Sequence, residues 1–442
     1  MGSGSSKETK NQFLLETLQE HKDAINVIAL SEDGSLLVTG SEDCSARMWS
    51  TKTENTECLG VLEGHEGYIS CINVTDTYIL TGSADSTIRK WDMTTCECLF
   101  VYQGHTAKVN RVISTGEFIF STSSDKTAKS WLFDAYDLEG EALTKVCLRT
   151  FKEHLKAVIP IIFIPSENMD GIDEDGMNIN PGDIVITGSN DAQARSWSFD
   201  TGGCLRVFKG HRGPITVMAT DPAGKMLYTG SSDHTIRCWV IQSGECRKVL
   251  EGHNGHILCL SVVNKLMYSG SSDAQAKCWV REFGDCTRDY KGHYHSVTCL
   301  KFHKGILYTG CGDAIARAFD AKSGAIKREF KGPDKGINCL TVCDHKLYTA
   351  DADGVLRVWD VKGLSDGLHA AHAHAEGEAV IDDNSDRQLD ALDKRLDGYM
   401  DKPDEVNGNV KPRDTPDIPG EVRPESPEMD DELARLADQL DV

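Results

Sequence analysis

Tyr78-Ile-Leu-Thr-Gly-Ser-Ala-Asp-Ser-Thr-Ile-Arg-Lys-Trp91 is the stretch of this 442-residue chain that decides its fold. Two runs rich in β-branched and aromatic residues flank the pair Asp85-Ser86, which is the pattern of two strands joined by a tight turn. The hydroxyl of Thr81, the carboxylate of Asp85 and the indole N–H of Trp91 can all form hydrogen bonds in an apolar interior. His65 precedes Thr81 by 16 residues and can join them.

The same four-point pattern recurs eight times along the chain. Its aromatic residues are Trp49, Trp91, Trp131, Trp197, Trp239, Trp279, Phe319 and Trp359, at spacings of 42, 40, 66, 42, 40, 40 and 40 residues. An aspartate lies six residues before each one, at Asp43, Asp85, Asp125, Asp191, Asp233, Asp273, Asp313 and Asp353. A hydroxyl residue lies four residues before each aspartate, at Thr39, Thr81, Ser121, Thr187, Thr229, Ser269, Thr309 and Thr349. The opening histidines are His21, His65, His105, His154, His211, His253 and His293, and Pro333 stands near the start of the eighth repeat. This regularity indicates a ring or stack of like units.

Each repeat contains four segments with the composition of short strands. In the second repeat these are residues 68–74, 78–83, 87–91 and 97–103. Four antiparallel strands per ~40 residues are typical of one blade of a β-propeller.

The four recurring side chains can satisfy one another when they are buried. We expect the aspartate to accept from the turn backbone and from the histidine, and the histidine to donate to the Ser/Thr hydroxyl. That hydroxyl would accept from the indole N–H, and charge-assisted bonds of this kind contribute roughly 1.5–3 kcal/mol each. We therefore predict structural tetrads in repeats one to six.

A catalytic role for these groups is disfavoured by their repetition. A hydrolase needs one nucleophile beside one base and an oxyanion site, whereas here the same set recurs in every repeat. The sequence also contains no phosphate-binding loop, dinucleotide fingerprint or zinc-protease helix. We expect no enzymatic activity, no cofactor and no metal; an enzyme with a pocket at the centre of the ring is the alternative from another class.

Further marks resemble those of the WD40-repeat family. They are the Gly-His pairs at residues 64–65, 104–105, 210–211, 252–253 and 292–293, and the Trp-Asp pairs at residues 91–92 and 359–360. The resemblance covers about residues 12–362 and implies an all-β, eight-bladed WD40 β-propeller. In that family each sequence repeat begins with the outer strand of the preceding blade, so residues 12–19 are expected to pair with the last blade and close the ring. Seven blades with one displaced repeat is the alternative.

Four positions depart from the family pattern. Phe319 has no N–H to donate and Pro333 cannot replace a histidine, so the networks of repeats seven and eight are expected to be incomplete. Glu20 and Glu153 replace the glycine before His21 and His154.

Charge and cysteine content narrow the class of protein. The net charge of −22 argues against nucleic acid as a ligand, because phosphate binding needs a basic surface. No apolar run is long enough to span a membrane and no secretory signal is present, so we expect a cytoplasmic protein.

The sixteen cysteines are then expected to be reduced, mostly in strands; a zinc site at Cys96 and Cys98 is the alternative. Residues 173–176 resemble part of a calcium loop, but Gly171 stands where its first ligand belongs.

The two ends of the chain lack the repeat marks. Residues 363–442 form an acidic tail, with two candidate short helices that carry Leu389, Leu392, Leu396 and Met400, and Met429, Leu433, Leu436 and Leu440. Residues 402–427 between them are expected to be extended or disordered.

Residues 1–11 form a flexible leader in which Gly2 matches an acceptor for N-myristoylation; an unmodified leader is the alternative. A single acyl chain would give weak, reversible membrane contact.

Function is expected to lie in the loops, because rigid blades present loops of variable sequence. The family's geometry places one set of basic and aromatic residues at one end of the ring: Tyr68, Lys108, Lys156, Arg212, His234, His256, Tyr294 and His295. We predict a monomeric, non-catalytic scaffold or adaptor that binds proteins or peptides. The alternatives are a substrate receptor of a ubiquitin ligase and a structural component of a large assembly such as an axoneme.

Overall fold

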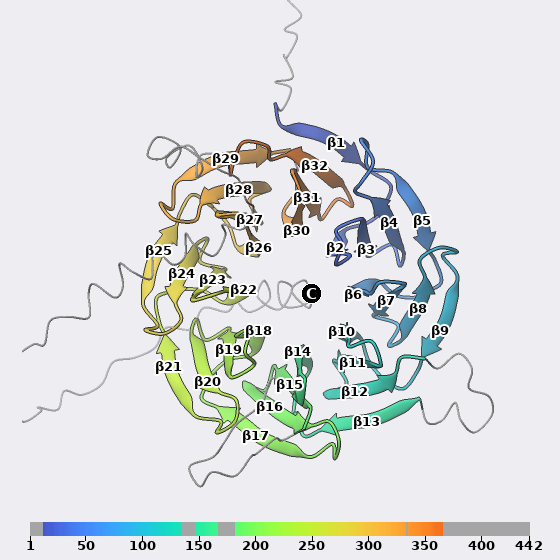
Figure 1. Cartoon of the computed structure of the whole chain (residues 1–442), viewed down its shortest axis with the longest axis vertical. Helices are drawn as coiled ribbons and strands as arrows, with labels where there is room; N and C mark the ends of the chain where they lie inside the picture. Colours follow the sequence, from blue (N-terminus) through green and yellow to red (C-terminus); the bar gives the residue numbers. More distant parts are fainter. Residues whose placement is uncertain (1–11, 135–145, 167–181, 333–334, 366–442) are drawn as a thin grey trace, which may run out of the picture. The chain divides into compact units, whose positions relative to one another are not determined.

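The computed structural model describes residues 12–134, 146–166, 182–332 and 335–365. These residues form eight four-stranded antiparallel sheets arranged in a ring (Figure 1). Each sheet is one blade, and the first strands of successive blades contact one another all the way round, including those of blades eight and one. The predicted all-β, eight-bladed propeller is therefore confirmed, and the seven-bladed alternative is wrong.

The strands of blades one to four have the following bounds. They are β2 (Ile25–Leu30), β3 (Leu36–Ser41), β4 (Ala46–Ser50) and β5 (Cys58–Leu62); β6 (Ile69–Val74), β7 (Tyr78–Ser83), β8 (Ile88–Asp92) and β9 (Cys98–Tyr102); β10 (Val109–Ser114), β11 (Phe118–Ser123), β12 (Thr127–Leu132) and β13 (Cys147–Lys152); and β14 (Val158–Ile164), β15 (Ile184–Ser189), β16 (Gln193–Ser198) and β17 (Cys204–Lys209).

Blades five to eight continue the same order. They are β18 (Ile215–Thr220), β19 (Met226–Ser231), β20 (Ile236–Val240) and β21 (Cys246–Leu250); β22 (Ile257–Val263), β23 (Leu266–Ser271), β24 (Ala276–Val280) and β25 (Cys286–Tyr290); β26 (Val297–His303), β27 (Ile306–Cys311), β28 (Ile315–Asp320) and β29 (Ile326–Lys331); and β30 (Ile337–Cys343), β31 (Lys346–Asp351), β32 (Leu356–Asp360) and β1 (Leu14–Leu18).

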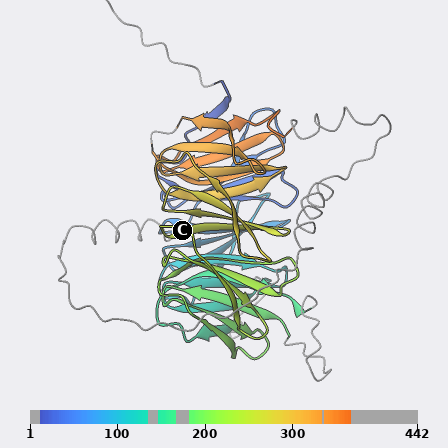
Figure 2. The same ribbon diagram turned by 90° about the vertical axis from the view of Figure 1, so that its left-hand side faces the viewer.

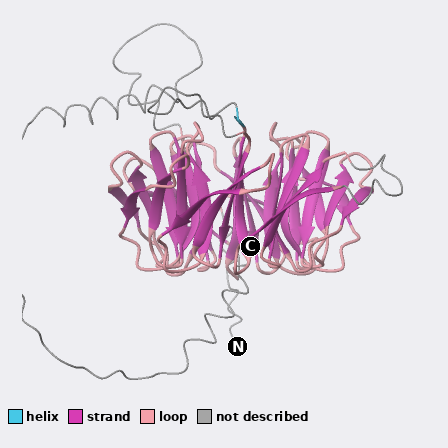
Figure 3. Cartoon of the chain, turned by 90° about the horizontal axis from the view of Figure 1, so that it is seen from below, coloured by secondary structure: helices cyan, strands magenta, loops and turns pink. Residues whose placement is uncertain are grey.

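The strands run between two layers of loops (Figures 2 and 3). In blade two, Tyr78 pairs with Asp92 and Gly82 pairs with Ile88. The turn between the second and third strands therefore lies at the same end of the blade as the loop that enters from the preceding blade. We call this end the tetrad face. The other end, with the turns that join strands one to two and three to four, is the hairpin face.

The ring is closed by the N-terminal strand, as predicted. β1 pairs antiparallel with β32, with Leu14 opposite Trp359 and Leu18 opposite Leu356. The side-chain amide of Asn338 on β30 also donates to the carbonyl of Ile25 on β2 at 3.0 Å, which links the last blade to the first. The first and last parts of the propeller are therefore joined by a sheet and by a partly buried hydrogen bond.

The hydrophobic core lies between blades. One representative cluster joins Leu80 and Tyr102 of blade two to Val109 and Trp131 of blade three. Each of the seven tryptophans is at most 1% exposed. Since a flat blade cannot cover its own apolar faces, each blade needs a neighbour on both sides, which makes closure important for stability.

The sixteen cysteines are all free. Several lie in strands, and burial raises the pKa of the Cys71 thiol to about 11 and that of Cys299 to about 12. These thiols are therefore protonated at neutral pH and pack as small apolar groups.

Several expectations fall on residues outside the described ranges. These are the acyl acceptor Gly2, residues 173–176, Pro333 and both candidate helices of the acidic tail. Within the described ranges, no helix is long and apolar enough to cross a membrane.

Deleting residues 1–20 should destabilise the ring and cause aggregation or strand exchange. The deletion removes β1, which exposes the edge of β32 and uncovers part of the core around Trp359. Size-exclusion chromatography and thermal unfolding would measure the effect, with a deletion of residues 1–11, which keeps β1, as the control. A monomer of unchanged melting temperature after the longer deletion would show that β1 does not close the ring.

Candidate functional site

The four recurring side chains meet in the interior of each of the first six repeats. In the second repeat, His65 Nδ1 lies 2.7 Å from Asp85 Oδ2 and His65 Nε2 lies 2.7 Å from Thr81 Oγ1. Trp91 Nε1 donates to the same hydroxyl at 2.8 Å. Asp85 Oδ1 also accepts from the N–H of Thr87 at 2.8 Å, so this carboxylate joins the turn to the loop.

The structure brings the corresponding groups together in the other five repeats. The His–Asp contacts, with their Nδ1–Oδ2 distances, are His21–Asp43 (2.8 Å), His105–Asp125 (2.7 Å), His154–Asp191 (2.9 Å), His211–Asp233 (2.8 Å) and His253–Asp273 (2.8 Å). The indole donors are Trp49, Trp131, Trp197, Trp239 and Trp279, on the hydroxyls of Thr39, Ser121, Thr187, Thr229 and Ser269.

The direction of one bond differs from the expectation. Burial lowers the pKa of His21 and of His105, so both rings are neutral at pH 7. Burial alone would raise the pKa of Asp43, but hydrogen bonds from Ser45, Lys22 and His21 lower it to about 2. An ionised carboxylate only accepts, so Nδ1 carries the ring proton and Nε2 has none. The Thr39 hydroxyl therefore donates to His21 Nε2 instead of accepting from it.

In repeat seven the hydrogen-bond network between the histidine and the aspartate includes the side chain of Arg317. This side chain is 1% exposed, and its Nη1 donates both to Asp313 Oδ2 at 2.7 Å and to His293 Nδ1. His293 Nδ1 must then be an acceptor, so the ring proton is on Nε2, which lies 2.6 Å from Thr309 Oγ1. The histidine tautomer is therefore the reverse of that of His21 and His105. The reversal compensates for Phe319, because Thr309 has no indole donor and can accept from the histidine.

Repeat eight uses a different carboxylate from the one that the spacing predicts. Asp353 lies near the surface, where it pairs with Lys335 at 2.8 Å. Asp351 is 1% exposed, and its Oδ1 accepts from the backbone N–H groups of Asp353 at 2.9 Å and Val355 at 3.1 Å. Its other oxygen pairs with Arg357. The expectation that Asp353 is the turn carboxylate is therefore wrong, because a buried aspartate two residues earlier takes over that role.

One group of potential metal ligands occurs among the described residues. The ligand atoms of His293, Cys311 and Asp313 lie within 4.8 Å of one another. However, Arg317 donates to both the histidine and the carboxylate, so a guanidinium fills the position that a cation would need. Burial also raises the pKa of the Cys311 thiol to about 12, which keeps it protonated. These residues fit an internal ion pair better than a metal site.

The tetrads also hold the loops of the tetrad face. The Asp Oδ2 atom accepts from the backbone N–H of the residue that follows the histidine position in seven repeats. These residues, with their distances, are Lys22 (3.0 Å), Glu66 (3.1 Å), Thr106 (3.1 Å), Leu155 (2.9 Å), Arg212 (2.9 Å), Asn254 (2.9 Å) and Tyr294 (3.1 Å). The backbone is thus fixed at these positions, while the side chain can vary.

The candidate binding residues lie on or near these loops. Lys156, Arg212, His234, Tyr294 and His295 are exposed, and Tyr68, Lys108 and His256 are half-buried. Two pairs come from neighbouring blades. The rings of His234 and His256 stack with their centroids 5.7 Å apart, and Lys108 Nζ lies 5.7 Å from the centroid of the Tyr68 ring.

Sequence reasoning missed Leu155. Its side chain is 72% exposed, second only to Tyr294 at 86% among the large hydrophobic residues described. Leu155 follows His154 as Arg212 follows His211 and Tyr294 follows His293. This shared position is the signal that could have identified it.

Asp85→Ala should destabilise the propeller strongly. The change removes the acceptor for His65, for the N–H of Glu66 and for Thr87, and an unsatisfied buried donor costs about 1–3 kcal/mol. A matched control is Asp92→Ala, whose carboxylate accepts from the N–H groups of Thr94 and Thr95 in an exposed turn of the hairpin face. Chemical denaturation of both variants would compare them, and an equal loss of stability would contradict a special role for Asp85.

Histidine-selective ¹⁵N NMR should reveal opposite tautomers in repeats three and seven. We expect the proton on Nδ1 of His105, which faces Asp125, and on Nε2 of His293, because Arg317 donates to His293 Nδ1. In the unaltered protein His293 Nδ1 lies 3.6 Å from Asp313 Oδ2. In Arg317→Met, His293 should take the Nδ1–H form and donate to this carboxylate. The same tautomer in both repeats of the unaltered protein would rule out this explanation.

Comparison with known proteins agrees with the geometry. The WD domain, G-beta repeat family matches residues 12–50, 56–92, 96–131, 202–240, 244–280, 284–320 and 324–360. The fourth repeat is not among these segments. Its first two strands, β14 and β15, are separated by residues 165–183, and the structure still forms the complete blade.

Individual relatives are similar over parts of their length. WD repeat-containing protein 86 of Homo sapiens is 40% identical over 81 residues, which is 18% of this chain and 19% of that protein. The sequence features that resemble it lie in residues 310–320 and 347–363. Mitochondrial division protein 1 of Neurospora crassa is 23% identical over 194 residues, 44% of this chain and 25% of that protein. The chain thus matches at most about a quarter of either relative's length.

The solved structure of Sqt1 from Saccharomyces cerevisiae shares the fold. It has a TM-score of 0.68 at 16% identity, over 79% of this chain and 99% of that one. The segments that match the family make up more than half of the sequence, and most of their tetrads are complete. This chain therefore belongs to the WD40, or G-beta repeat, family.

Proposed function

We propose that this chain is a non-catalytic interaction scaffold whose tetrad face binds an acidic surface or peptide of a protein partner. The observation that carries the proposal is that Leu155 and Tyr294 are exposed on loops whose backbone is held by the tetrad aspartates. An apolar side chain on a fixed backbone loses little conformational freedom on binding and can serve as an anchor.

The charge around these anchors supports an acidic partner. Between Leu155 and Tyr294, the loops of the tetrad face carry the cations Lys156 and Arg212. They also carry His234 and His256, and burial lowers the pKa of His256, so that this ring is a neutral hydrogen-bonding group. The aspartates of the same loops are engaged by their histidines and by backbone N–H groups. A partner with carboxylates around an apolar group would therefore match this arc of the tetrad face.

The burial of the tetrads supports a non-catalytic role. The hydroxyls that contact the histidines belong to residues with no exposed surface, such as Thr81, Ser121 and Thr187. A buried hydroxyl cannot reach a substrate carbonyl or phosphate, although it lies beside a histidine paired with an aspartate. The resemblance to a catalytic triad therefore supplies no nucleophile at the surface.

Proximity labelling in cells should identify partners that depend on the tetrad face. The full-length protein would be compared with Leu155→Glu combined with Tyr294→Ala. Leu59→Glu is the control, since Leu59 is a 55% exposed leucine on the outer strand β5. We expect the first variant to lose a set of partners that the control retains, at unchanged melting temperature. Identical partners for all three proteins would contradict binding through this face.

A further inference from the structure

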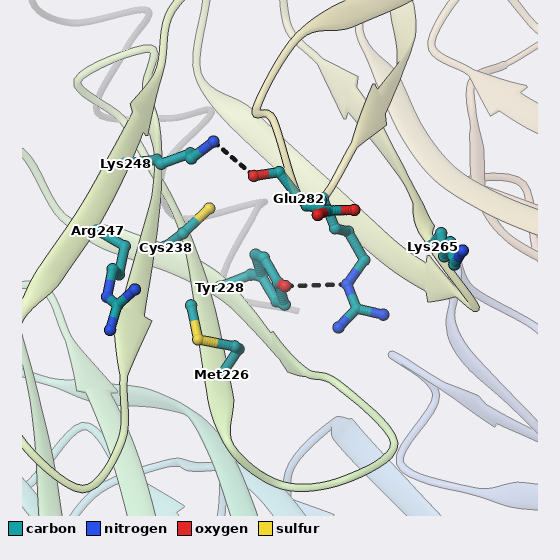
Figure 4. Close-up of a pocket in the computed structure, with 8 residues that line it drawn as sticks. Met226, Tyr228, Cys238, Arg247, Lys248, Lys265 and Glu282 are labelled. Carbon is teal, nitrogen blue, oxygen red and sulfur yellow. Dashed lines mark hydrogen bonds between the residues drawn. The ribbon is translucent and has the colours of Figure 1, made fainter. Parts of the chain in front are cut away.

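A cavity of about 320 Å³ lies between blades five and six (Figure 4). Met226, Tyr228 and Cys238 of blade five line it, together with Arg247 and Lys248 on the outer strand of that blade. Blade six contributes Lys265, Arg281 and Glu282. Met226, Lys265 and Glu282 border the turns that define the hairpin face, so the cavity lies toward the face opposite the candidate binding loops.

The internal repeats explain why this cavity exists. In most repeats the residue two positions after the core aromatic packs on the second strand of the preceding blade. Phe133 packs beside Leu80, the ring of Phe199 lies 5.3 Å from that of Phe120, and Ile241 packs beside Ile186. At the same position blade six carries Arg281, opposite Tyr228. An apolar group that fills the neighbouring interfaces is therefore replaced by a charged one.

The guanidinium of Arg281 is drawn toward polar partners. Its Nε donates to the hydroxyl of Tyr228 at 2.9 Å, and its Nη2 lies 3.6 Å from Asp221. It also donates to the carbonyl of Asn264. These contacts hold the side chain across one side of the interface, and the space beside Met226 and Cys238 stays unfilled (Figure 4).

The lining combines an apolar floor with cationic walls. Met226 and Cys238 supply the floor, and burial raises the pKa of the Cys238 thiol to about 12, so it is uncharged. Four of the eight lining residues are cationic and one is acidic. Arg247 is 62% exposed at the rim, where its Nε lies 3.7 Å from Glu245 Oε2 in an exposed ion pair that a ligand carboxylate can replace. Lys248 Nζ donates to the carbonyl of Glu282 at the opposite wall. A ligand that matches this lining has an apolar group about the size of Phe or Ile beside carboxylates.

We propose that this cavity is a second binding site, which receives one aromatic or branched aliphatic side chain from an acidic peptide segment of a protein partner. The inserted side chain occupies the space that Phe133, Phe199 and Ile241 fill in the neighbouring interfaces, and the flanking carboxylates contact Arg247 and Lys248. This site is independent of the tetrad face, since it lies toward the other end of the blades.

A photo-crosslinking peptide tests the site directly. The probe is a labelled acidic heptapeptide with benzoylphenylalanine at its centre and aspartates or glutamates on both sides. Benzophenones react readily with methionine, so we expect cross-linking of the full-length protein at Met226, located by mass spectrometry. The matching peptide with a central phenylalanine should compete, and one with a central alanine should compete about tenfold less well or worse.

Two variants decide between the cavity and adventitious binding. Arg281→Phe restores the residue found at positions 133 and 199, so it should fill the cavity, keep or raise the melting temperature, and abolish cross-linking at Met226. Lys248→Glu should weaken binding of the phenylalanine peptide, measured by fluorescence anisotropy, by about tenfold. Its control is Arg288→Glu, at the same register on the outer strand of blade six.

The possible outcomes separate this site from the proposed tetrad-face site. Cross-linking at Leu155 or Tyr294 instead of Met226 would assign the peptide to the tetrad face and overturn the cavity proposal. Cross-linking at Met226 that survives in Arg281→Phe, or equal effects of Lys248→Glu and Arg288→Glu, would also overturn it. Leu155→Glu combined with Tyr294→Ala should leave cross-linking at Met226 unchanged, whether or not the tetrad face binds its own partner.

Discussion

The hydrogen bond between the turn aspartate and the buried histidine connects the other features of this propeller. The imidazole and the Ser/Thr hydroxyl lie inside a blade, where an unpaired polar group costs about 1–3 kcal/mol. The aspartate satisfies the imidazole with one oxygen and the backbone of its own turn with the other, as Asp85 does with His65 and Thr87. It thereby ties the second and third strands of a blade to the loop that arrives from the preceding blade. Local turn geometry and the packing of neighbouring blades are thus fixed by one carboxylate.

Repeats seven and eight show that this constraint applies to the network as a whole and not to individual residues. When the indole is absent at Phe319, Arg317 enters the interior and the tautomer of His293 is reversed, so that each remaining donor still has an acceptor. When the carboxylate at Asp353 turns to the surface, Asp351 accepts from the same turn. In repeat eight a second aspartate takes over from the first, whereas in repeat seven Arg317 stands at a register that is basic in every repeat and only its direction changes. Both arrangements follow because a half-satisfied network is less stable than a complete one.

The sequence was sufficient for the ring, the number of blades, the closing strand and the six regular tetrads, since these follow from residue types at fixed spacings. Side-chain direction was harder to predict. Arg317 occupies a register where Arg47 and Arg195 pair with Glu20 and Glu153 near the surface, and nothing in the spacing indicates that it turns inward. The direction of the hydrogen bond between the Ser/Thr hydroxyl and the histidine depends on which ring nitrogen carries the proton, and the sequence does not specify that. The cavity beside Tyr228 depends on which residue the next blade contributes, so it becomes visible only when Arg281 is compared with Phe133, Phe199 and Ile241.

The same repetition explains how binding sites can arise without loss of the fold. On the tetrad face the aspartate binds the N–H of the residue after the histidine, so Lys22, Glu66, Leu155 and Tyr294 can differ in side chain while their backbone is held alike. Between the blades, the position of Arg281 is supported by the turns and by Tyr228, so an apolar residue can be replaced there without opening the ring. Both proposed sites therefore lie at positions where the structural requirement is met by the backbone or by another residue. In a propeller such positions recur in every blade, and a single blade can diverge at them while its neighbours maintain the ring.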